Sequence, residues 1–158
     1  MFVRVTQGDP LAAPLLGGLA EEYSCRYGGT TERMMGWLTS RPADEFAAPH
    51  GGMVIGLLDG VPVTGGAFCR FDEQTAELKR IWTDSGHRRK GYAALLLAEL
   101  EAAIAAVGYR RIYLTTGHRQ PEAEALYAAA GFTRLAAPRE PDWTTTVVSP
   151  IAFEKVLA

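Results

Sequence analysis

The chain has 158 residues, 47% of them hydrophobic and 22% charged, with a formal net charge of −2. This length and composition predict one soluble domain over residues 1–158, with a core large enough to fold without disulfides or metals. The slightly negative charge argues against general nucleic-acid binding, and charged residues interrupt the apolar runs before they reach the length of a membrane span. We therefore expect neither nucleic acid nor a membrane as a partner.

Apolar periodicity and turn residues divide the chain into alternating strands and helices. In chain order the predicted elements are a strand over 1–6, a helix over about 10–25, a short helix over about 30–38, strands over 53–58, 61–70 and 75–83, a helix ending at Gly108, a strand over 109–115, a helix over about 120–131, a short strand over 132–135 and a last strand region over 144–156. The Asp59-Gly60 pair predicts a tight hairpin turn. A right-handed crossover after residue 83 makes the strands on either side of it parallel. The fold class is α/β (α+β), with one mixed sheet.

The start of the chain and its cysteines give two further expectations. Met1 to Val5 alternates directly, without a leader-like apolar segment, so we expect a cytoplasmic location. Cys25 and Cys69 are far apart and outside any metal-ligand spacing, so we expect buried free thiols and no metal site.

The segment Arg88-Arg89-Lys90-Gly91-Tyr92-Ala93 is a basic turn that leads into an alanine- and leucine-rich helix. Small residues at Gly91 and Ala93 let a ligand approach the backbone, and the free amides of a helix start favour an anion. This pattern predicts a phosphate site, although a capped helix start with solvated arginines would look the same in isolation. The helix itself places Leu96, Leu100, Ala103, Ile104 and Val107 on one face, which we expect to be buried.

The strand over 75–83 has no cleanly apolar face. Strict alternation puts Glu77, Lys79, Ile81 and Thr83 on one side and Leu78, Arg80 and Trp82 on the other. A bulge explains this pattern better than an ordinary half-buried strand does. The alternative is an edge strand with polar residues.

Three segments, Ala76–Thr83, Arg88–Ala93 and Gln120–Tyr127 followed by Gly131-Phe132, resemble successive motifs of the GNAT family of acyl-CoA-dependent N-acetyltransferases. The resemblance covers residues 53–135 in the family's order. It implies the GNAT fold: a mostly antiparallel sheet of about seven strands, with a V-shaped splay between the fourth and fifth strands, and about four helices. It also implies an acetyltransferase that uses acetyl-CoA and no metal, acts on a small-molecule or peptide amine, and can be a homodimer.

The resemblance further implies roles for particular residues. Those implied to bind the cofactor are Ile81, Trp82 and Thr83 on the strand, Arg88, Arg89, Lys90, Gly91, Tyr92, Ala93 and Ala94 around the loop, and Gln120. Residues in the regions that select the acceptor are Tyr23, Tyr27, Trp37 and His50, where aromatic rings would suit a cationic amine. Each of these four can equally be structural, and His50 can be a capping histidine or a second base.

Two residues are candidates for the chemistry. The resemblance makes Glu77 the group that deprotonates the amine, but Glu and a lysine-like ammonium differ by about 6 pK units, or roughly 8 kcal/mol, so direct transfer needs a neutral amine, a raised pKa or a water chain. A Glu77 that simply pairs with Lys79 or Arg80 is the alternative.

Tyr127 is the implied acid for the departing thiolate. A phenol and a thiol differ by only about 1.5 pK units, roughly 2 kcal/mol. The alternative is a core tyrosine that donates to a carbonyl.

The expected reaction is direct attack of the amine on acetyl-CoA in a ternary complex, with a backbone N–H of Trp82 or Ile81 stabilising the oxyanion. Cys25 or Cys69 as an acyl-carrying nucleophile is disfavoured, because neither has a neighbouring histidine. Two other classes stay open: a non-catalytic acyl-CoA-binding module that would not need Tyr127, and a nucleic-acid-binding domain that uses the arginines.

Overall fold

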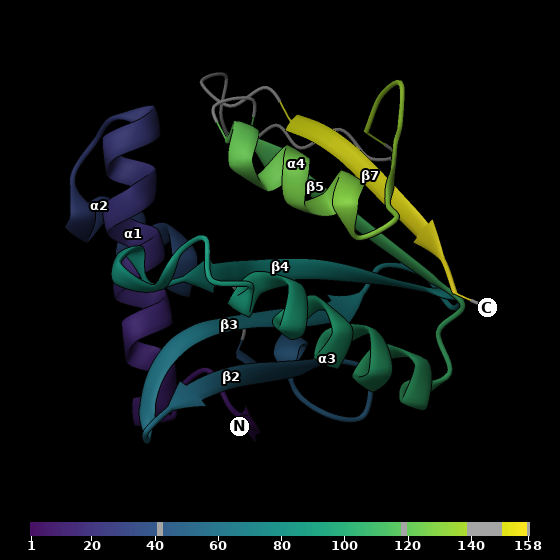
Figure 1. The fold of residues 1–158 in the computed structure, drawn as a ribbon, viewed down its shortest axis with the longest axis horizontal. Helices are drawn as coiled ribbons and strands as arrows, with labels where there is room; N and C mark the ends of the chain where they lie inside the picture. The colour runs from purple at the N-terminus through teal and green to yellow at the C-terminus, as the bar shows by residue number, and fades with distance from the viewer. Residues whose placement is uncertain (41–42, 118–119, 139–149, 158) are drawn as a thin grey trace.

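In the computed structural model, which describes residues 1–40, 43–117, 120–138 and 150–157, the chain folds around one mixed sheet (Figure 1). Its strands are β1 (Phe2–Val5), β2 (Gly52–Leu58), β3 (Val61–Arg70), β4 (Thr75–Thr83), β5 (Arg111–Gly117), β6 (Thr133–Arg134) and β7 (Pro150–Val156). The helices are α1 (Ala13–Tyr27), α2 (Thr31–Thr39), α3 (Tyr92–Val107) and α4 (Pro121–Ala129), with 3-10 turns η1 (Pro10–Ala12), η2 (Ala43–Phe46) and η3 (Ser85–His87).

The strand order is β1-β2-β3-β4-β5-β7-β6, and every pairing is antiparallel except that of β4 with β5. This confirms the expected mixed sheet, its parallel pair and the number of helices. Residues 144–149 of the expected last strand lie outside the described residues. The β2–β3 hairpin turns through Asp59 (φ 51°) and Gly60 (φ 79°), the two positive φ values that a tight hairpin turn of this type requires.

Helices cover both faces of the sheet. Consecutive residues of a strand point to opposite faces, and Val54 packs in the core with the α3 residues Leu96 and Leu100, while its neighbour Ile55 packs with α1. The α3 core therefore lies on one face and the α1 core on the other. Val107 was expected in the first core, but its side chain is 40% exposed, because α3 ends there and Gly108 leads the chain away.

The fourth and fifth strands separate after a short paired segment. Pairing runs from Thr75 with Arg111 to Glu77 with Tyr113 and stops there. On the other edge of β4, Lys79 pairs with Ala67 and Trp82 with Gly65, so Arg80 and Ile81 together face one residue of β3. Arg80 has a φ of 62° at this point. The predicted bulge is therefore present, and Figure 1 shows β4 and β5 diverging beyond it.

The bulge explains why simple alternation failed for this strand. Leu78 and Ile81 both pack in the α3 core, whereas Trp82 packs with α1 on the opposite face. A strand without an extra residue would have placed Leu78 and Trp82 on the same side.

Candidate functional site

The loop before α3 is a turn with basic side chains and two residues in the left-handed region of backbone conformation. Arg89 has a φ of 63° and Gly91 a φ of 84°, and α3 begins at the next residue. A Cβ on Gly91 would meet no atom within 4 Å, so open space lies above this glycine and only its φ disfavours a side chain. No side chain caps the helix start. The amides of the first turn, including those of Tyr92, Ala93 and Ala94, therefore have no helical partner and face a basic loop, which suits a bound phosphate.

Ion pairs connect this loop to α1 and α4. The Arg88 guanidinium lies 3.3 Å from the Glu22 carboxylate, and its Nε donates to the Thr83 carbonyl at 3.4 Å. Arg26 pairs with Glu22 at 3.0 Å and also with Glu122 at the start of α4. The last turns of α1 thus contact both the loop that follows β4 and the helix that follows β5.

The splayed part of β4 carries Ile81, Trp82 and Thr83, and beyond Glu77 this strand has no pairing with β5. The carbonyl of Trp82 accepts a hydrogen bond from the Thr64 hydroxyl at 2.8 Å on the β3 side. The buried Trp82 ring packs directly on α1, because a Cβ on Gly18 would lie 2.2 Å from its Nε1. Glycine at position 18 therefore sets the approach of α1 to the bulge.

Glu77 lies in the last paired row, at the apex of the splay. Its carboxylate is half-buried and lies 3.3 Å from the Lys79 ammonium. The pair with Lys79 that the alternative, structural role of Glu77 predicts is therefore present. Arg80 instead turns with the bulge, and its guanidinium donates to the Leu38 carbonyl and lies over the Phe46 ring.

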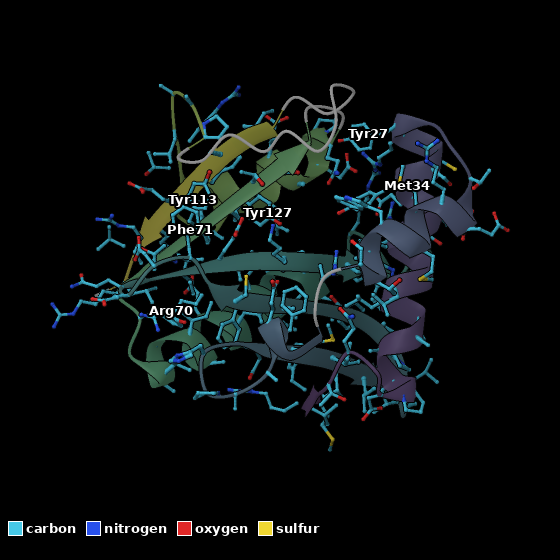
Figure 2. The ribbon with its side chains drawn as sticks, turned by 180° about the vertical axis from the view of Figure 1, so that it is seen from behind. Tyr27, Met34, Arg70, Phe71, Tyr113 and Tyr127 are labelled. Carbon is cyan, nitrogen blue, oxygen red and sulfur yellow. The ribbon has the colours of Figure 1, made fainter. Side chains whose placement is uncertain are left out.

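Tyr127 is 5% exposed and projects from α4 toward the opening between β4 and β5 (Figure 2). Its ring packs against Phe132 and Phe153, with centroid distances of 5.7 and 5.8 Å. Its hydroxyl makes no hydrogen bond with any residue that the structure describes. Burial, with a smaller effect from the nearby Tyr23, raises the pKa of Tyr127 well above that of a free phenol. The group therefore holds its proton throughout the physiological pH range.

Three of the four candidate acceptor residues lie together on α1 and α2. Tyr23 is 6.3 Å from Tyr27 and 6.2 Å from Trp37 between ring centroids, both in edge-to-face arrangements. His50 does not join this cluster. It lines a separate hollow of about 430 Å³ with Cys69 and Arg70, and its carbonyl accepts a hydrogen bond from the Tyr109 hydroxyl at 2.8 Å.

Gln120 lies between the aromatic cluster and β5. Its Oε1 accepts from the Thr116 hydroxyl at 3.2 Å, and its Nε2 donates to the Tyr27 hydroxyl at 3.3 Å. A Cβ on Gly117 would lie 1.7 Å from that Tyr27 oxygen, so glycine is required where the ring meets the end of β5. The contact places Tyr27 at the open end of the splay.

Several of these contacts were absent from the sequence predictions. The Glu22–Arg26 pair has the (i, i+4) spacing that favours ion pairs on a helix, and that signal could have been read. The partners Arg88 and Glu122 are distant in sequence and carry no such signal. Of the two cysteines, Cys69 is buried as expected, but Cys25 is exposed.

The comparisons with known proteins agree with this geometry. Residues 18–132 match the model of the acetyltransferase (GNAT) family, which is more than half of the chain, and the protein therefore belongs to this family. No curated protein matches the chain.

Solved structures with the same fold share little sequence with this chain. An acetyltransferase of the GNAT family from Staphylococcus aureus has a TM-score of 0.78 at 14% identity, with 100% of both chains covered. The PaiA N-acetyltransferase of Thermoplasma acidophilum, in complex with coenzyme A, has a TM-score of 0.76 at 15% identity, covering 99% of this chain and 98% of its own. A GNAT family acetyltransferase from Elizabethkingia anophelis, with acetyl-CoA bound, has a TM-score of 0.66 at 18% identity, covering 99% and 97%.

The described residues lack two further features. None of their helices combines the length and apolar character that crossing a bilayer requires. In the same residues, no three His, Cys, Asp or Glu side chains are grouped so that they could hold a metal ion.

Proposed function

We propose that this protein transfers the acetyl group of acetyl-CoA to a primary amine by direct attack in a ternary complex. The observation that carries the proposal is the placement of three features around one splay. A helix start without a side-chain cap, preceded by basic residues, lies at its open end. An edge of β4 that is not paired with β5 runs along the splay, and a buried tyrosine projects from α4.

The loop and the strand edge fit the two ends of the coenzyme A chain. The amides of residues 91–94, with Arg88, Arg89 and Lys90 beside them, would hold the pyrophosphate. The backbone of Ile81, Trp82 and Thr83 would hydrogen-bond the pantetheine amides as an added strand does. An N–H of Trp82 or Ile81 would then be placed to stabilise the negative charge that develops on the thioester oxygen.

Tyr127 would supply the proton that the thiolate takes up as it leaves. Its phenol is protonated at neutral pH, and its hydroxyl has no competing acceptor among the described residues. Burial raises its pKa above that of a free phenol, so the proton transfer costs more than the gap between the free groups indicates. Glu77, beside Lys79 at the apex, would accept the proton of the amine, directly or through water. The aromatic rings of Tyr23, Tyr27 and Trp37 would favour a cationic acceptor.

The test is acetyl-CoA turnover against a panel of amines that includes peptide N-termini, polyamines, amino acids and aminoglycosides. Tyr127→Phe is expected to lower kcat by roughly 10²- to 10⁴-fold, the usual contribution of a general acid, with little change in the KM for acetyl-CoA. Tyr109→Phe is the matched control, because its hydroxyl donates to the His50 carbonyl, away from the splay. It should retain the wild-type kcat.

A non-catalytic acyl-CoA-binding module would give a different pattern. It would bind acetyl-CoA in a thermal-shift assay, release no free CoA with any amine, and respond equally to the two tyrosine substitutions. That result would contradict the proposed acetyltransferase activity. Ping-pong kinetics with an acetylated cysteine would instead contradict the direct attack.

A further inference from the structure

A second hollow lies at the narrow end of the splay, on the opposite side of Glu77 from the anion loop. Its volume is about 390 Å³, and it forms where β4 and β5 begin and β7 ends. The residues that line it are Asp72, Gln74, Thr75, Arg110, Arg111 and Val156. None of these has a role in the proposed chemistry.

Arg111 is the unusual residue of this hollow. Its Nε is buried and has no hydrogen-bond partner among the described residues. Its guanidinium forms no ion pair with any residue of the described ranges, and the neighbouring Arg110 side chain forms none either. The backbone N–H groups of the two arginines donate to the Gln74 carbonyl, at 2.8 and 3.1 Å. A buried, unsatisfied donor of a charged group is costly, and such groups in native proteins usually mark a missing partner.

The charge of the hollow favours an anion as that partner. Asp72 is its one acidic lining residue, and one of its carboxylate oxygens accepts from the Gln74 N–H at 2.9 Å. Two guanidinium groups against one carboxylate leave a net positive charge. The Nε and one Nη of an arginine form a fork that matches the two oxygens of a carboxylate.

The sheet register connects this hollow to the reactive apex. Arg111 pairs with Thr75 and Tyr113 pairs with Glu77, and one row, Ala76 with Ile112, lies between these two. Ile112 and Leu114 face the α3 core, and Arg111 and Tyr113 therefore point to the opposite face. Residues two apart on a strand are separated by about 7 Å. Arg111 thus lies two rows from Glu77, on the same face of the sheet.

We propose that Arg111 binds a carboxylate of the acceptor, while the amine of the same molecule lies at Glu77. This inference rests on the proposed acetyltransfer and names its substrate class: an amine with a carboxylate about 7 Å away, the length of an extended dipeptide. Arg111 is then a specificity-determining residue. It selects acceptors by their charge without taking part in proton transfer.

The test compares diglycine with diglycinamide, which differ only in the terminal charge. The wild type is expected to have a lower KM for diglycine. Arg111→Gln should raise that KM by roughly 10- to 100-fold, which corresponds to the loss of a charge-assisted hydrogen-bonded pair. The KM for diglycinamide and the KM for acetyl-CoA should not change. Arg33→Gln, at an exposed arginine of α2, is the matched control and should leave every constant as in the wild type.

Arg111→Lys keeps the charge but loses the fork, so it should retain part of the preference and provides a second variant if Arg111→Gln fails to fold. Equal constants for the two dipeptides in the wild type, or an equal loss for both in Arg111→Gln, would overturn the proposal.

Direct calorimetric binding of diglycine, without acetyl-CoA, separates this inference from the reaction itself. Binding of diglycine but not diglycinamide, abolished in Arg111→Gln, would support the site even if no amine were acetylated. In that case the proposed acetyltransfer would be contradicted, and the proposed carboxylate site at Arg111 would be supported. A wild type that binds neither dipeptide would overturn the site.

Discussion

Substitution of Gly18 by alanine tests how closely α1 controls the bulge of β4. The new Cβ would lie 2.2 Å from Trp82 Nε1, 2.9 Å from its Cδ1 and 3.0 Å from its Cε2. Ordinary contacts need about 3.5 Å, so the ring or the helix must move by about 1.3 Å. Trp82 is buried against Leu15, Leu19 and Ile55 and has little room to turn. Overpacking of this kind costs about 1–3 kcal/mol.

The neighbouring glycine provides a matched control. A Cβ on Gly17 would meet no atom within 4 Å. Both substitutions gain the helix preference of alanine over glycine, about 1 kcal/mol, and this common gain cancels in the comparison. Gly18→Ala should therefore be less stable than Gly17→Ala by about 2 kcal/mol. For a chain of this length that difference lowers the Tm by about 4–8 °C.

Thermal unfolding followed by circular dichroism measures the difference, and the KM for acetyl-CoA gives a second readout. The Gly18 variant should raise this KM because Trp82 belongs to the strand edge proposed to bind the ligand, whereas the Gly17 variant should not. Equal Tm values for the two variants would refute the close contact. An unchanged KM in a destabilised Gly18 variant would refute the link from α1 to the strand edge.

Two further predictions concern α1. Glu22→Gln removes the ion pair with Arg88, which is worth about 0.2–1 kcal/mol at this partly exposed position. Because Arg88 is then available to the pyrophosphate, the KM for acetyl-CoA should fall by up to about fivefold in initial-rate kinetics. Glu21→Gln, at the exposed neighbouring residue, should leave this KM unchanged. Burial, followed by the charge of Glu22, raises the pKa of Tyr23 to about 12. The unfolded phenol ionises near pH 10, so the stability that comes from this shift is complete below pH 10 and is lost as the pH rises toward 12. Denaturant unfolding at a series of pH values should show this fall in the wild type and a smaller one in Tyr23→Phe.

The local features of the fold could be predicted from the sequence, because short patterns of neighbouring residues determine them. The Asp59-Gly60 turn needs two positive φ values, and these residue types tolerate them. The absence of a clean alternation from Glu77 to Thr83 pointed to an inserted residue, and the bulge at Arg80 is that residue. The loop before α3 was recognised from Gly91 and the basic residues ahead of it.

Contacts between distant segments could not be read in this way. The pairing of Arg26 with Glu122 and of Arg88 with Glu22 depends on how α1 packs on the sheet. Gly18 lets α1 approach Trp82 closely, yet a glycine inside a helix has no sequence signature that distinguishes close packing from a merely tolerated residue. The sequence places His50 with the acceptor residues because it follows the same helices. In the structure it lies apart from them, in the hollow that it shares with Cys69 and Arg70.

The position of β7 also determines when the site can form during synthesis. This strand is late in the chain, yet it lies inside the sheet, where it pairs with β5 along seven residues and holds β6 on its other edge. The arm of the splay opposite β4 is therefore incomplete until β7 has been made, although β1 to β4 and α3 already have their partners. Because chains assemble from the N-terminus as they are synthesised, the loop before α3, which we propose binds coenzyme A, is in place before the strand that faces it has been made.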